Sequence, residues 1–283
     1  MKRSRALALF AAVFLLLSLC TGCKEKGTYL PVLMYHDIND EKEESGTVVH
    51  SDTFRRQMEI LRDNAYSPVS PAQVIDFVEN GTPLPEKPVL ITFDDGYESN
   101  YALAYPILRE FGFPAVIFAV GFSFGATEFY KDTENRLTPH FGGDAAREMV
   151  DSGLITLGSH TYDMHAWAPF EKDPDASREN VLPRDGENEE QYRKVMSEDI
   201  EKQHALFAEN GLPQPEILAF PNGKFVPLTD EILRENGYKM TLTTDCSHRN
   251  FLREGEAQTL FDLGRLCMEG ATSERDLLAY LNG

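Results

Sequence analysis

Basic residues are scarce in this chain of 283 residues, which has 27 Lys and Arg against 46 Asp and Glu and a formal charge of −19. The first 23 residues hold Lys2, Arg3 and Arg5 and no acid. Without them the chain has 24 basic and 46 acidic side chains and a charge of −22. This sign argues against a surface for nucleic acid or anionic lipid. It suits a soluble domain that works outside the cell.

Cysteine is also scarce, with four residues in the chain and no zinc-finger spacing between them. Cys20 and Cys23 lie in the N-terminal segment. Cys246 and Cys267 each lie in an apolar, strand-like run of the remaining chain. These two either form one disulfide in an oxidising compartment or remain as two buried thiols.

The apolar run near the N-terminus is short. It covers 14 residues, 6–19, whereas a membrane span needs about 20. With its basic start and the small residues that follow, the segment is typical of a signal peptide. Its end, "LCTGC", resembles the bacterial lipobox, although Cys20 stands where that motif usually has Leu. The alternative lipobox cysteine, Cys20, follows Leu19 where a small residue is expected, so the resemblance implies lipidation at Cys23.

These features predict a lipoprotein signal peptide at 1–23 and a short tether at 24–30. An uncleaved membrane anchor is the alternative, and it gives the same location. We therefore expect an exported, extracytoplasmic protein that is lipid-anchored at the cell membrane.

Short apolar runs alternate with helical patterns after the tether. The strand-like runs are 31–38, 88–96, 114–121, 154–161, 216–223, 238–245 and 263–269. This alternation predicts a parallel α/β fold, with a closed or nearly closed (β/α) barrel as first choice and a doubly wound open sheet as the alternative. In both folds functional residues gather at the C-terminal strand ends. The polar segments 122–142 and 166–190 follow strand ends and are expected to rim that face.

Polar residues recur at these predicted ends. In chain order they are His36, Asp94, Asp95, His160, His165, the turn "FPNG", Asp245 and Arg265. One carboxylate and two imidazoles suit Zn²⁺ or a similar ion with a position left for water. A second carboxylate beside them suits a general base. A single histidine is usually structural and "DDG" or "FPNG" alone is usually a turn, but "TFDDG" together with "SHTYDMH" is a specific pair.

These motifs resemble those of the polysaccharide deacetylases, carbohydrate esterase family 4. The order "VLMYHDI", "TFDDG", "GSHTYDMH", "AFPNG" and "GYKMTLTTD" extends the resemblance over 31–283. The early "MYH" and the four residues between the histidines resemble the extracellular poly-N-acetylglucosamine deacetylases of biofilm systems. The resemblance implies a distorted (β/α)₇ barrel and a divalent metal, most commonly zinc, with cobalt or nickel as alternatives.

The resemblance also implies roles for individual residues. Asp95, His160 and His165 would bind the metal, and Asp94 would be the general base for hydrolysis of an N-acetyl group. The backbone N–H of Asn222 would stabilise the oxyanion.

Two departures from the family pattern concern the second half of the chain. The family's motif arginine aligns with Ala219, so Arg265 is the candidate to orient the base instead. The late histidine of the family is missing from "RLCMEG". His36 is then the candidate general acid, and a structural role for His36 is the alternative. Trp167 and Tyr162 are candidates to stack on a sugar ring.

The expected partner is an N-acetylglucosamine polymer, with the membrane contacted through lipidated Cys23 and no nucleic acid bound. Peptidoglycan and chitin oligomers carry the same acetamide and are alternative substrates. A third hypothesis is that the protein is a surface lipoprotein that binds carbohydrate without catalysis. The intact aspartate pair and both histidines argue against it, because a binding module needs no metal site with a spare base.

Overall fold

The structure is a computed structural model that describes residues 27–173 and 178–283. The predicted signal peptide, including Cys23, lies outside the described residues. The predicted tether reaches them at its end, where Thr28–Tyr29 forms β1, antiparallel to β11 (Phe251–Leu252). Leu30 is fully buried. The tether prediction is therefore wrong for 28–30, because residues 28–29 pair with β11 and Leu30 is buried in the domain.

Seven parallel strands form the centre of the fold, in the order β10-β9-β8-β7-β6-β2-β12. They are β2 (Val32–Tyr35), β6 (Pro88–Phe93), β7 (Ala115–Ala119), β8 (Ile155–Ser159), β9 (Ile217–Ala219), β10 (Met240–Leu242) and β12 (Leu266–Cys267). Each lies inside a predicted run. An isolated parallel bridge between Leu242 and Leu263 brings the two sheet edges together. The result is the distorted (β/α)₇ barrel and not the open sheet.

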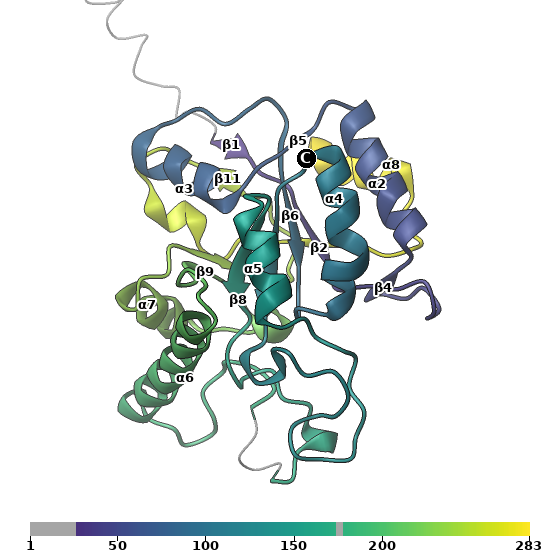
Figure 1. Cartoon of the computed structure of the whole chain (residues 1–283). Helices are drawn as coiled ribbons and strands as arrows, with labels where there is room; N and C mark the ends of the chain where they lie inside the picture. Colours follow the sequence, from purple (N-terminus) through teal and green to yellow (C-terminus); the bar gives the residue numbers. More distant parts are fainter. Residues whose placement is uncertain (1–26, 174–177) are drawn as a thin grey trace, which may run out of the picture.

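Helices cover the outside of the strands (Figure 1). They are α2 (Ser51–Asp63), α3 (Pro71–Asn80), α4 (Tyr105–Phe111), α5 (Gly143–Asp151), α6 (Glu189–Glu209), α7 (Pro227–Glu235) and α8 (Glu274–Asn282). Local residues set both ends of helix α3: Ser70 and Gln73 form a capping box at its start, and left-handed Gly81 ends it. Across residues 27–173 and 178–283, no helix is long and apolar enough to cross a membrane.

The remaining elements are short. They are β3 (Asp37–Ile38), β4 (Val48–Val49), β5 (Ser67–Pro68), the π-helix η2 (Asn100–Ala104) and the 3₁₀ turns η3 (Gly121–Ser123), η4 (Ala168–Phe170), η5 (Pro221–Gly223) and η6 (Ala257–Leu260). The irregular segments after β7 and β8 extend beyond the strand ends, at the bottom of Figure 1. They correspond to the two polar segments that were predicted to rim the functional face.

Both cysteines of the domain are free thiols. Cys246 is exposed, so it is not the buried thiol that one alternative required. Cys267 is half-buried, and its thiol donates a hydrogen bond to the Gly46 carbonyl.

Candidate active site

Strand β6 delivers two adjacent aspartates to different surroundings. The strand is entirely buried, and the N–H of Asp94 donates to the Tyr35 carbonyl at 2.9 Å, which keeps Asp94 extended beside β2. The chain then turns sharply, because Asp95 (φ 71°) and Gly96 (φ 78°) both take left-handed conformations. A Cβ on Gly96 would lie 3.3 Å from the Ala119 Cα. The turn leaves Asp94 buried and directs Asp95 towards a pocket.

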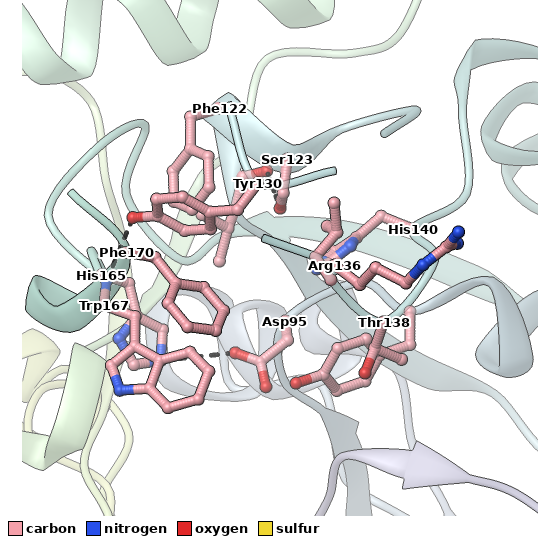
Figure 2. A pocket seen from close by; sticks show the side chains of 13 residues that line it. Asp95, Phe122, Ser123, Tyr130, Arg136, Thr138, His140, His165, Trp167 and Phe170 are labelled. Carbon is pink, nitrogen blue, oxygen red and sulfur yellow. Dashed lines mark hydrogen bonds and ion pairs between the residues drawn. The ribbon is translucent and has the colours of Figure 1, made fainter. Parts of the chain in front are cut away.

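Asp95, His160 and His165 come together as the sequence predicts. One ligand atom from each lies within 4.8 Å of the others. The Nε2 atoms of His160 and His165 lie 3.7 Å and 3.4 Å from the Oδ1 atom of Asp95. Figure 2 shows His165 facing Asp95 across the floor of the pocket.

The second nitrogen of each histidine is occupied by backbone. His160 Nδ1 lies 2.8 Å from the Ala219 carbonyl, and His165 hydrogen-bonds to the backbone of Glu179. In metal sites, such contacts fix the tautomer of a histidine ligand and direct its free nitrogen towards the ion. One carboxylate and two oriented imidazoles therefore fit a divalent metal.

The electrostatics of His160 and Asp95 agree with this fit, whereas burial lowers the pKa of His165 less than the hydrogen bond and charge of Asp95 raise it. Burial lowers the pKa of His160 to about 4, against the opposing charge of Asp94. Burial opposes ionisation of Asp95, but the hydrogen bond and charge of His165 outweigh it and hold the pKa of Asp95 below its usual range. A neutral imidazole and an ionised carboxylate are the forms that bind metal.

Asp94 is held by a fully buried arginine. The guanidinium Nη1 and Nη2 atoms of Arg265 donate to Oδ1 and Oδ2 of Asp94 at 2.6 Å and 2.7 Å. Arg265 Nε also donates to the Thr243 carbonyl at 2.9 Å. Burial penalises ionised Asp94, but the charge and hydrogen bonds of Arg265, together with the nearby His160 and His36, outweigh this and lower the pKa of Asp94. Arg265 thus contacts the carboxylate that the sequence suggests as the base.

His36 follows β2 and approaches the other side of Asp94. Its Nε2 atom is 4.0 Å from Asp94 Oδ2, and its side chain is 16% exposed. Within the described residues its buried Nδ1 atom has no hydrogen-bond partner. Asn100 holds the backbone here by donating to the His36 carbonyl at 2.7 Å. The imidazole is therefore close to the carboxylate without being bonded to it.

Asn222 lies in the turn η5 after β9, with φ of 57°. Its side-chain amide donates to the Glu179 carbonyl at 2.9 Å, and the Glu179 backbone is also the partner of His165. The turn therefore borders the metal cluster. Asp245 does not: it is exposed, and its carboxylate accepts the N–H of Ser247 two residues on. This strand-end residue forms a local turn outside the cluster.

A cavity of about 280 Å³ opens beside Asp95 and His165. Figure 2 shows aromatic rings along one side of it and Arg136, Thr138 and His140 along the other. The aromatic lining residues are Tyr97, Phe122, Tyr130, Trp167 and Phe170. Trp167 is 57% exposed and accessible to a ligand. Tyr162, the other predicted stacking residue, is not part of the lining and packs against Gly121 instead.

Charged residues join the two segments that wall the cavity. The ammonium group of Lys131, from the segment after β7, lies 2.7 Å from Asp163 and 2.5 Å from Glu171, both from the segment after β8. The hydroxyl of Tyr130 also donates to Glu171. The pocket walls are therefore fastened to each other and to the loop between the two histidines.

Sequence reasoning missed two residues at the pocket floor. Tyr97 stands in "ITFDDGY" without an assigned role, and its hydroxyl hydrogen-bonds to Asp95, whose charge raises the pKa of Tyr97 well above its usual value. His140 packs against Tyr97 with ring centroids 5.0 Å apart. Burial lowers the pKa of His140 to about 4, so it is neutral near pH 7. Its place within a polar segment gave no signal.

Comparison with known proteins adds to this geometry. A sequence model described as polysaccharide deacetylase matches residues 81–241. The chain is 29% identical over 221 residues to a putative polysaccharide deacetylase of Bacillus subtilis, covering 78% of this chain and 66% of that protein. It is 29% identical over 241 residues to the poly-beta-1,6-N-acetyl-D-glucosamine N-deacetylase of Escherichia coli, covering 77% of this chain and 34% of that protein.

A similar structure is IcaB from Ammonifex degensii, with a TM-score of 0.71, 28% identity and coverage of 91% of this chain and 99% of that one. The chain thus spans about two thirds of the Bacillus relative and one third of the Escherichia relative. It matches IcaB over nearly the full length of both.

Proposed function

Because the chain belongs to the polysaccharide deacetylase family, we propose that it hydrolyses N-acetyl groups of an N-acetylglucosamine polymer in a metal-dependent reaction. One observation carries the proposal. Three metal-ligand atoms lie within 4.8 Å of one another, and the adjacent carboxylate of Asp94 is held separately by buried Arg265. A structural ion site has no need of that second, separately held carboxylate.

Asp95, His160 and His165 would hold the ion, with zinc as first choice and cobalt or nickel as alternatives. When bound, a divalent metal would acidify a water molecule and polarise the acetamide carbonyl. Tyr97 supports this side of the site, because its hydroxyl fixes the orientation of the Asp95 carboxylate.

The chain's own residues would move the protons. Arg265 keeps Asp94 ionised, so Asp94 can accept a proton from the attacking water. The water oxygen bonds to the acetamide carbon, the C–N bond breaks, and acetate and a free amine result. His36, 4.0 Å from Asp94, would donate a proton to the departing amine nitrogen. The backbone N–H of Asn222 would donate to the oxyanion.

The pocket supports a sugar substrate. Exposed Trp167 offers an aromatic face beside the metal cluster, and aromatic faces pack well on sugar rings. The relatives named as poly-beta-1,6-N-acetyl-D-glucosamine N-deacetylases favour a β-1,6-linked polymer. We also propose that the protein acts outside the cytoplasm, anchored to the membrane through lipidated Cys23.

Acetate release from defined oligomers tests the proposal. The purified protein is given β-1,6- and β-1,4-linked N-acetylglucosamine oligomers and peptidoglycan fragments, with metal removed by a chelator and then restored as zinc, cobalt or nickel. We expect release from the β-1,6 oligomers that stops on chelation and returns with metal. If the protein released acetate preferentially from another polymer, that polymer would replace the β-1,6-linked one as the proposed substrate. Folded, metal-loaded protein that releases no acetate from any of them would refute catalysis.

A further inference from the structure

The loop between the two histidine ligands is unusually constrained. Its first residue, Thr161, takes a left-handed conformation (φ 70°) that is rare for a β-branched side chain. The Thr161 hydroxyl accepts the N–H of Met164 at 3.1 Å. Met164 is buried in the same apolar cluster as Met196 and Ile200 of α6. The loop is therefore folded back upon itself and docked on that helix.

Asp199 of α6 holds the middle of the loop. Its Oδ2 and Oδ1 atoms accept the N–H groups of Tyr162 and Asp163, both at 2.8 Å. Asp199 as a whole is 7% exposed. On the opposite side, the N–H of Gly121 donates to the Thr161 carbonyl at 3.0 Å, and the N–H of Phe122 donates to the Tyr162 carbonyl at 2.8 Å. The peptide groups of the loop are thus held from both sides.

The two ligands depend on this loop to different degrees. His160 directly follows β8, and the Ala219 carbonyl orients its ring. His165 follows the loop, so its position depends on the path of the backbone from Thr161 to Met164. A buried carboxylate that accepts two consecutive N–H groups defines that path at its centre.

We propose that Asp199 is a positioning residue that sets the place of His165 relative to His160 and Asp95, and thereby the metal affinity of the site. This inference rests on the metal site of the proposed function. Asp199 contacts neither substrate nor reacting atoms, and it acts through the backbone of Tyr162 and Asp163. Nothing in the motif spacing points to it, since it lies 34 residues after His165 on a different element.

The substitution Asp199→Asn tests the proposal. The amide oxygen can accept a hydrogen bond from one of the two N–H groups, but the amide nitrogen then faces the other. One of the two hydrogen bonds is therefore lost. Loss of a supporting contact in a metal site typically weakens binding by about 10- to 100-fold. Glu201→Gln is the matched control, because it removes one negative charge from an exposed position two residues along the same helix.

Three quantities are measured on the full protein: zinc affinity by competition with a chelator, the visible absorption spectrum with Co²⁺ bound, and the melting temperature without metal. We expect Asp199→Asn to bind zinc about 10- to 100-fold more weakly, with an altered cobalt spectrum, and the control to match wild type. Asp199→Ser leaves room for water at the two N–H groups and provides a second variant if the first folds poorly.

A folded variant with zinc affinity within about twofold of wild type and an unchanged cobalt spectrum would overturn the inference, even if its melting temperature fell. That result would leave Asp199 with a role in helix docking alone. The wild-type protein tests the proposed function separately: if it binds no metal, the metal site itself is refuted and this inference with it. If the wild-type protein binds metal and releases acetate, the proposed function holds, and the result for the Asp199 variant then tests the role of Asp199 alone.

Discussion

The proposed catalytic half of the site, Asp94 with Arg265, and the proposed metal half, Asp95 with His160 and His165, share the end of strand β6 but are not held in the same way. Asp94 and Arg265 directly adjoin strands β6 and β12 and are 2% and 0% exposed. His165 lies on a loop and its side chain is 26% exposed. Strand geometry therefore fixes the catalytic half, whereas one member of the metal half, His165, depends on loop contacts.

Two buried carboxylates show how differently the halves are held. Burial opposes the ionisation of Asp94, but the guanidinium of Arg265 and the nearby His160 and His36 together lower its pKa. Burial raises the pKa of Asp199 to about 6, and the hydrogen bonds from two backbone N–H groups offset this only in part. An adjacent full charge compensates for desolvation where neutral donors do not.

The largest contrast is expected between Asp94→Asn and Asp95→Asn. Loss of the base should lower kcat by about 10²- to 10⁴-fold while zinc remains bound. Loss of the ligand should instead abolish tight zinc binding, and activity with it. Zinc content and acetate release are measured on the same samples. Near-normal turnover by folded Asp94→Asn would show that Asp94 is not the base.

Arg265→Met should cause the largest loss of stability. It leaves Asp94 buried without its partner, which costs about 3–5 kcal/mol of unfolding free energy. Arg55→Met is the control, since its ion pair with Glu110 lies on the surface and contributes about 0–1 kcal/mol. Denaturant unfolding measures both. Equal losses would mean that the buried pair is no more important to folding than a surface pair.

The pH dependence of stability should distinguish Asp199 from Asp94. The pKa of Asp199 is raised in the folded state, so its contribution is fully present below about pH 4 and is lost as pH rises through 6. Between pH 4 and 6.5, the unfolding free energy of the metal-free wild-type protein should therefore fall by up to about 3 kcal/mol relative to that of Asp199→Asn. Asp163 and Lys202 face this carboxylate and oppose each other in sign.

Asp94 should show no such loss in that window, because a lowered pKa gives stability that disappears only as pH falls below about 4. Thermal unfolding of wild type and Asp199→Asn at several pH values provides the measurement. A difference between the two proteins that stays constant with pH would contradict the raised pKa of Asp199.

The smallest effect is expected at the pocket wall. Trp167→Ala should raise KM for oligomers by about 3- to 10-fold, because an aromatic packing contact is lost, while zinc affinity stays the same. Phe129→Ala is the matched control, since Phe129 is an exposed aromatic outside the pocket lining. Steady-state kinetics with oligomers of increasing length provides the measurement. Equal KM values for Trp167→Ala and wild type would remove Trp167 from the sugar site.

Much of this architecture could be predicted from the sequence, since continuous apolar runs mark buried parallel strands. All seven predicted runs contain a strand of the barrel. The two-residue strands β1 and β11 could not be predicted, because they pair across more than 220 residues and show no periodicity of their own. For the same reason residues 28–30 were predicted as tether.

The site also contains residues that could be predicted from the sequence and residues that could not. Asp94, Asp95, His160 and His165 were predictable because strand ends converge on one face. The pairing of Arg265 with Asp94 requires the barrel order, which places β12 next to β2 and β2 next to β6. Asp199 acts on backbone N–H groups, and backbone partners leave no pattern in side-chain spacing.

The most direct test of the central claim is acetate release measured against equivalents of zinc added to the metal-free protein. We expect no release without metal, a linear rise as zinc is added, and a break at about one equivalent, because the Asp95, His160 and His165 cluster would hold one ion. The same titration of His160→Ala should show no rise at these concentrations. Release by metal-free wild-type protein at the full rate would contradict the account.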